Sequence, residues 1–127
     1  MPLLLRPVGT APSTTYFVGN MLQLAGSLLA LVATLTLGRH FGIVAAHRGV
    51  QMSGLYRLVR HPIYLAYLIS NGGFVLAYPH IHNAVVLVLW VVVQAWRALM
   101  EERVLMTDAA YHAYTKRVRY RFVPGVW

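Results

Sequence analysis

The chain has 127 residues, of which 58% are hydrophobic and only 11% are charged, whereas a soluble domain is usually about 25% charged, so the composition argues against a soluble globular protein. Eleven Lys and Arg residues against three acids give a net charge of +8, but these charges border the apolar stretches and form no basic domain, so we expect no nucleic-acid partner. The absence of cysteine excludes disulfides and thiolate metal sites.

A polar lead of about sixteen residues precedes the first apolar stretch. No Asp, Glu, Lys or Arg occurs between Pro7 and Gly38. Because a transmembrane helix needs about 20 mainly apolar residues, we predict a first span over residues 17–38. Gly19 and Gly26 lie within it, and small residues of this kind allow close helix packing in lipid.

The second apolar stretch is too long for one span and is interrupted by "AYPHIHN", in which Pro and Asn indicate a turn. We therefore predict a hairpin of two helices over residues 62–78 and 82–106. Pro62 suits the first turn of a helix. The glycines of residues 70–73 either weaken that helix or let another backbone approach closely. Asp108 is expected to cap a short helix that runs from Ala109 to about Val118.

The predicted fold is an all-α integral membrane protein, a single domain over residues 1–127, with about three transmembrane helices and a short cytoplasmic C-terminal helix. Its orientation follows from the basic residues, which cluster between the first and second spans and after the third. The turn near Pro79 has none, and the N-terminal lead has only Arg6. Under the positive-inside rule, the 39–61 segment and the C-terminus are cytoplasmic and the N-terminus is outside.

Two polar clusters are expected at the cytoplasmic ends of the hairpin, where they would lie close together. One contains Tyr56, Arg60, His61 and Tyr64, and the other contains Arg97, Glu101 and Glu102. Arg97 and Glu101 are four residues apart and share a helix face. Spacing alone leaves two interpretations open: topology signals with a surface ion pair, or a functional site at the edge of the membrane.

Three ordered segments resemble the isoprenylcysteine carboxyl methyltransferase and phospholipid methyltransferase group of integral membrane enzymes. They are "SGLYRLVRHPIYLAY", then "RALMEERVL", and finally "YHAYTKRVRYRFVPG". The resemblance covers about residues 48–125. It implies S-adenosyl-L-methionine as cofactor, bound at the cytoplasmic membrane face between the ends of the hairpin helices.

The resemblance also implies roles for particular residues. Arg97 falls where the carboxyl methyltransferases hold the acceptor carboxylate, which makes it the candidate catalytic residue. The acidic pair resembles that of the phospholipid methyltransferases. The positions that match cofactor-binding positions are Gln51, Tyr56, His61, Pro62, Tyr64, Glu101 and Glu102. A histidine and the N–H groups at a helix N-terminus suit the cofactor carboxylate, and an aromatic face suits a sulfonium.

The function expected is methylation of a lipophilic acceptor, a carboxylate or an amine. The alternative is a non-catalytic membrane assembly protein that keeps the family fold, because family members usually have further N-terminal helices. Membrane lipids are expected partners, with the tail arginines meeting anionic lipid. No metal site is expected, since His80 and His82 have no further ligands evident nearby. A homo-oligomer, the acceptor and the methylated atom stay open.

Overall fold

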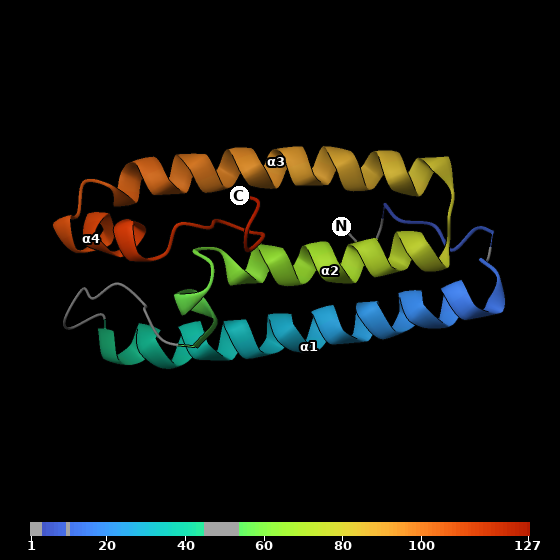
Figure 1. Cartoon of the computed structure of the whole chain (residues 1–127), viewed down its shortest axis with the longest axis horizontal. Helices are drawn as coiled ribbons and strands as arrows, with labels where there is room; N and C mark the ends of the chain where they lie inside the picture. The colour runs from blue at the N-terminus through green and yellow to red at the C-terminus, as the bar shows by residue number, and fades with distance from the viewer. Residues whose placement is uncertain (1–3, 10, 45–53) are drawn as a thin grey trace.

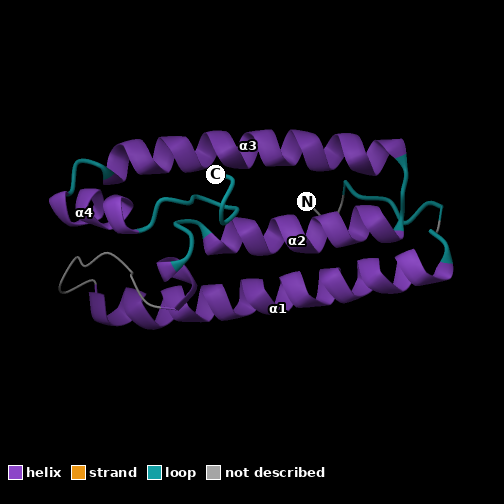
Figure 2. Cartoon of the chain, in the orientation of Figure 1, coloured by secondary structure: helices purple, strands orange, loops and turns teal. Residues whose placement is uncertain are grey.

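The computed structural model describes residues 4–9, 11–44 and 54–127, with side chains described over 4–9, 11–36 and 54–127. The elements in chain order are α1 (Ser13–Val44), the 3-10 helix η1 (Gly54–Arg57), α2 (Pro62–Ala77), α3 (Ile81–Leu105) and α4 (Ala109–Arg117). Every regular element in these ranges is helical (Figure 2). The all-α prediction is therefore confirmed.

Two of the helices are long and apolar enough to cross a membrane. They are α1, over Ser13–Thr36, and α3. The third apolar helix, α2, has 16 residues, and at 1.5 Å per residue it extends about 24 Å, short of a hydrocarbon core of about 30 Å. The expectation of about three spans is thus confirmed for two helices, with α2 as a shorter apolar helix between them.

The predicted limits of the hairpin helices are accurate, and the predicted first span, residues 17–38, lies close to the candidate span Ser13–Thr36, although α1 itself is longer. Helices α2 and α3 begin and end within one residue of the predicted limits. Helix α1 begins at Ser13 and continues to Val44, beyond the predicted end at residue 38. The prediction ended the span at the first glycine and arginine after the apolar run. A helix tolerates a glycine at a cost of only about 1 kcal/mol. A charged residue ends the apolar stretch that can lie in a membrane, but it does not end the helix.

Helix α2 lies between α1 and α3, and the α2–α3 turn lies at the end of the molecule opposite α4 (Figure 1). Helix α2 packs extensively against α1 and touches α3 at fewer places. The α1–α2 contact depends on glycine, because a Cβ atom on Gly19 would lie 2.6 Å from the carbonyl oxygen of Gly73, and one on Gly73 would lie 2.5 Å from the carbonyl oxygen of Gly19. The second alternative for residues 70–73, close backbone approach, is therefore confirmed.

A buried asparagine fastens the N-terminal lead to the hairpin turn. The Asn83 side chain is fully buried. Its Oδ1 accepts from the backbone N–H of Arg6 at 2.9 Å, and its amide donates to the carbonyl oxygens of Arg6 at 2.8 Å and Tyr78 at 3.0 Å. Because all its buried polar atoms are paired, Asn83 stabilises this end without a ligand.

Candidate functional site

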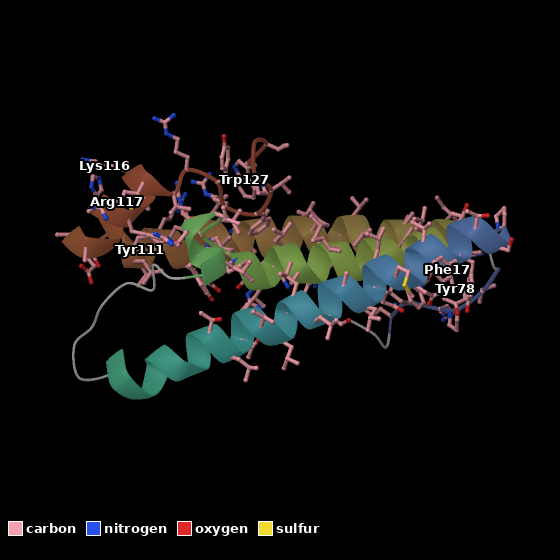
Figure 3. The ribbon with its side chains drawn as sticks, turned by 60° about the horizontal axis from the view of Figure 1, so that its bottom comes forward. Phe17, Tyr78, Tyr111, Lys116, Arg117 and Trp127 are labelled. Atoms are coloured by element: carbon pink, nitrogen blue, oxygen red, sulfur yellow. The ribbon has the colours of Figure 1, made fainter. Side chains whose placement is uncertain are left out.

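The predicted polar clusters meet at the end of the molecule that carries α4. Figure 3 shows Tyr111, Lys116 and Arg117 at this end and Phe17 and Tyr78 at the other. Pro62 is the first residue of α2, as predicted, and His61 precedes it as the N-cap residue. The cluster therefore combines the start of α2, the last turns of α3 and the segment that follows α4.

Glu102 is the centre of this end. Its side chain is only 7% exposed. Arg60 Nη1 and Arg121 Nε donate to its Oε2 at 3.0 and 2.9 Å, and His61 Nε2 lies 3.1 Å from its Oε1. A buried carboxylate is stable only when paired and hydrogen-bonded, so this network joins α3 to the residues before α2 and to the C-terminal segment.

The C-terminal segment, residues 118–127, covers the start of α2. The backbone N–H groups of Arg60 and His61 donate to the carbonyl oxygens of Tyr120 and Arg121, both at 2.9 Å. Arg60 also donates through Nε to the Val118 carbonyl at 2.8 Å. The backbone N–H groups of the two residues that precede α2 are thus bound within the protein.

Aromatic rings enclose His61. Its imidazole stacks on the Tyr64 ring, with centroids 5.4 Å apart and planes 16° apart. The buried Phe122 side chain meets both rings edge-on, with centroid distances of 5.8 and 5.6 Å. His61 Nδ1 lies 4.0 Å from Glu101 Oε2. The histidine therefore lies between two neighbouring carboxylates, with its ring face covered.

Glu101 differs from Glu102 because it is partly accessible. Its side chain is 43% exposed and that of Arg97 is 59% exposed. Tyr64 Oη donates to Glu101 Oε1 at 2.8 Å, and Arg97 Nη2 lies 3.7 Å from the same oxygen. The predicted Arg97–Glu101 pairing is confirmed, and it leaves a carboxylate and a guanidinium available to a polar ligand.

Three tyrosines pack behind the site. Tyr56 is buried, and its carbonyl oxygen accepts from the Tyr114 hydroxyl at 2.7 Å. Burial raises the pKa of Tyr56 and of Tyr114, and it raises the pKa of Tyr111 to about 12. These phenols therefore stay neutral at physiological pH and act as packing and hydrogen-bonding groups.

Six of the predicted cofactor-binding residues lie at this end of the molecule, and Gln51 lies outside the described residues. Sequence reasoning missed Arg121 and Phe122, which belong to the cluster. Arg121 was expected to meet anionic lipid with the rest of the tail. It binds Glu102 instead, and its guanidinium carbon lies 5.0 Å from the centre of the Trp127 ring. The signal in the sequence for these two residues is the tail segment "YHAYTKRVRYRFVPG", which contains both of them.

The two adjacent glutamates provide a matched stability test. Glu102→Ala leaves the largely buried Arg60 and the partly exposed Arg121 without their carboxylate, a loss that should cost about 3–5 kcal/mol. Glu101→Ala removes a half-exposed pair and should cost about 1 kcal/mol. Thermal unfolding of both variants in the same detergent measures the difference. Equal melting temperatures would contradict the central role of Glu102.

Comparison with known proteins identifies the family of this chain. No curated protein and no solved structure gives a significant match. A family model described as phospholipid methyltransferase matches residues 14–113. The match includes nearly all of α1, all of α2 and α3, and the first half of α4, and with them His61, Tyr64, Arg97 and the two glutamates. Since it covers most of the sequence, this chain belongs to the phospholipid methyltransferase family.

Proposed function

We propose that this protein is an S-adenosyl-L-methionine-dependent methyltransferase that acts on a lipophilic acceptor at the cytoplasmic face of a membrane. The observation that carries the proposal is the accessible Tyr64–Glu101–Arg97 group, which lies at the end of apolar helices in a chain of a methyltransferase family. A polar group of this kind is costly beside lipid unless it is paired or serves a ligand.

The residues at this end fit the cofactor chemically. Its bound form supplies an electrophilic methyl group on a sulfonium. Glu101 offers a carboxylate for an ammonium or a diol, because only part of its side chain is covered. The Tyr64 ring stacks on His61 through one face, and its other face is the one that can meet a cation. Arg121, which is 27% exposed, offers a second guanidinium for a carboxylate. The residues that are present therefore match each charged part of the cofactor.

The other predicted cofactor-binding residues hold the Tyr64–Glu101–Arg97 group in place, except Gln51. Glu102 uses both oxygens inside the protein, so we assign it to positioning His61 and Arg60 instead of direct ligand binding. Tyr56 and Pro62 are buried and shape the wall behind His61. Gln51 keeps the cofactor role that the family resemblance implies.

Methyl transfer is an in-line displacement, and fixing two reactants in line supplies much of the acceleration. An amine acceptor must lose a proton, and Glu101 is the accessible carboxylate that can take it. A carboxylate acceptor needs no base, and Arg97 can bind it through its planar guanidinium. The acceptor class therefore decides which member of the Arg97–Glu101 pair matters most.

The membrane arrangement that we propose has three spans, with α2 crossing as the shortest. The basic residues Arg103, Lys116 and Arg117 lie at the end that carries the candidate site, whereas the α2–α3 turn contains no Lys or Arg. Under the positive-inside rule the site end is cytoplasmic and the turn lies outside.

This orientation can be tested directly because the chain contains no cysteine. Single cysteines introduced at His82 and at Lys116 should react with a membrane-impermeant maleimide from opposite sides of sealed vesicles. Labelling of both positions from one side would rule out the three-span arrangement.

Cofactor binding can be tested with a substitution that removes the charge of Glu101 and keeps its shape. Glu101→Gln should weaken binding of S-adenosyl-L-methionine about tenfold or more, because a hydrogen bond to a charged group contributes about 1.5–3 kcal/mol. Isothermal titration of purified protein measures this. Asp108→Asn is the matched control, since Asp108 caps α4 and Asn caps equally well. Weaker cofactor binding in both variants, or in neither, contradicts the assignment of Glu101 to the cofactor site. Absence of binding by correctly inserted wild type would support the non-catalytic alternative.

Arg97→Lys separates the acceptor classes. If the acceptor is a carboxylate, the variant should keep cofactor binding and lose most methyl transfer to lipophilic acids, because Lys cannot form the bidentate contact. If the acceptor is an amine, transfer should be nearly unchanged, since Lys still pairs with Glu101 at this spacing. The measurement is methyl transfer to a panel of lipophilic acids and amines by both proteins. Equal transfer to every acid would remove Arg97 from acceptor binding.

A further inference from the structure

Gln94 is a polar residue within the apolar part of α3 whose role the proposed function does not explain. Its Oε1 atom is shielded from solvent and accepts no hydrogen bond from the described part of the chain. The residue as a whole is only half-buried. An unpaired buried amide oxygen destabilises a protein by about 1–3 kcal/mol. Within a lipid bilayer no water is present to donate a hydrogen bond to it.

The helical periodicity of α3 places Gln94 toward α2. Trp90, Gln94, Ala98 and Glu101 follow one another at spacings of three or four residues and so share one face. Trp90 contacts the Tyr67 ring of α2, and Ala98 is fully buried. The opposite face carries the exposed apolar side chains Val85, Val88, Leu89, Val92, Val93, Trp96 and Leu99. Gln94 therefore lies on the α2-facing side and not among the lipid-facing residues.

Along this face Gln94 lies between two contacts that join α2 to α3. On one side is the Tyr64–Glu101 hydrogen bond of the candidate site, and on the other is the Tyr67–Trp90 ring contact, at 6.4 Å between centroids. Gln94 precedes Glu101 by seven residues, about 10 Å along the helix axis. Tyr67 is 42% exposed, and the residue that its ring contacts, Trp90, lies one turn before Gln94.

We infer that Gln94, together with Tyr67, binds a hydroxyl group of the acceptor lipid, about 10 Å further into the membrane than Glu101. A hydroxyl both donates and accepts, so it can donate to Gln94 Oε1 while it accepts from the Tyr67 phenol. The terminal amide torsion is soft, and the open side of the half-buried residue lets a ligand reach it. This inference rests on the proposed function and makes Gln94 a specificity-determining residue of the same site.

The experiment compares two lipids that differ only in the hydroxyl. The probes are a lysophosphatidylethanolamine with one brominated acyl chain and its 2-O-methyl ether, which keeps the oxygen and loses the proton. Bromine quenching of tryptophan fluorescence reports binding, since Trp90 lies one turn from Gln94. Wild type should bind the hydroxyl lipid about fivefold to tenfold more tightly than the ether.

Substitution should remove this preference selectively. Gln94→Leu should bring the ratio of the two affinities close to one and leave cofactor affinity unchanged, and Tyr67→Phe should reduce the ratio partly. Val93→Leu, on the lipid-facing side, is the control and should keep the wild-type ratio. Gln94→Met, unbranched and similar in length, gives the same prediction should the leucine variant fail to fold.

Several results would overturn the inference. They are equal binding of both lipids by wild type, a preference that survives in Gln94→Leu and Gln94→Met, or a change of self-association in these variants, which would assign the amide to a second copy of the chain. The readout needs no methyl transfer. A preserved hydroxyl preference in a protein that transfers no methyl group would therefore reject the proposed function while supporting the lipid site.

Discussion

The buried Glu102 carboxylate is the interaction on which the arrangement of the candidate site depends. Helix α2 touches α3 at few places, so apolar packing alone only weakly fixes the start of α2 relative to the end of α3. Arg60, His61 and Arg121 converge on Glu102 from two other segments. Because a buried charge tolerates little displacement of its partners, the network sets the distance between the start of α2 and the end of α3. That distance lets Tyr64 reach Glu101.

Neighbouring residues of one type take different roles here because a helix turns by about 100° per residue. Glu102 points into the network and is 7% exposed, whereas Glu101 points toward Arg97 and is 43% exposed. Both oxygens of Glu102 are hydrogen-bonded within the protein, one to Arg60 and one to His61, which makes it a structural anion. Glu101 has bonding capacity that the protein leaves partly accessible. The adjacent pair therefore combines a carboxylate that stabilises the structure, Glu102, with a candidate ligand-binding carboxylate, Glu101.

Features set by local spacing could be predicted from the sequence. The hairpin limits, the Pro62 helix start, the Asp108 cap and the Arg97–Glu101 pair each depend on residues within four positions of one another. The contacts of Arg121 with Glu102 and of Asn83 with Arg6 join residues far apart in the chain. No periodicity encodes such contacts, since they arise only when the helices are packed. The tail arginines were assigned to lipid as a group, and nothing in their spacing separates Arg121 from its neighbours.

The covering of His61 also bears on the direction from which a ligand reaches the site. The 118–127 segment lies over the start of α2, and Phe122 covers the His61 and Tyr64 rings. Glu101 keeps 43% of its side chain exposed, and its partner Arg97 lies one turn further into the apolar part of α3. An exposed guanidinium beside an apolar stretch is stabilised by its carboxylate partner. The exposed Arg97–Glu101 pair thus lies where α3 continues into its apolar stretch, whereas residues 118–127 cover the neighbouring start of α2.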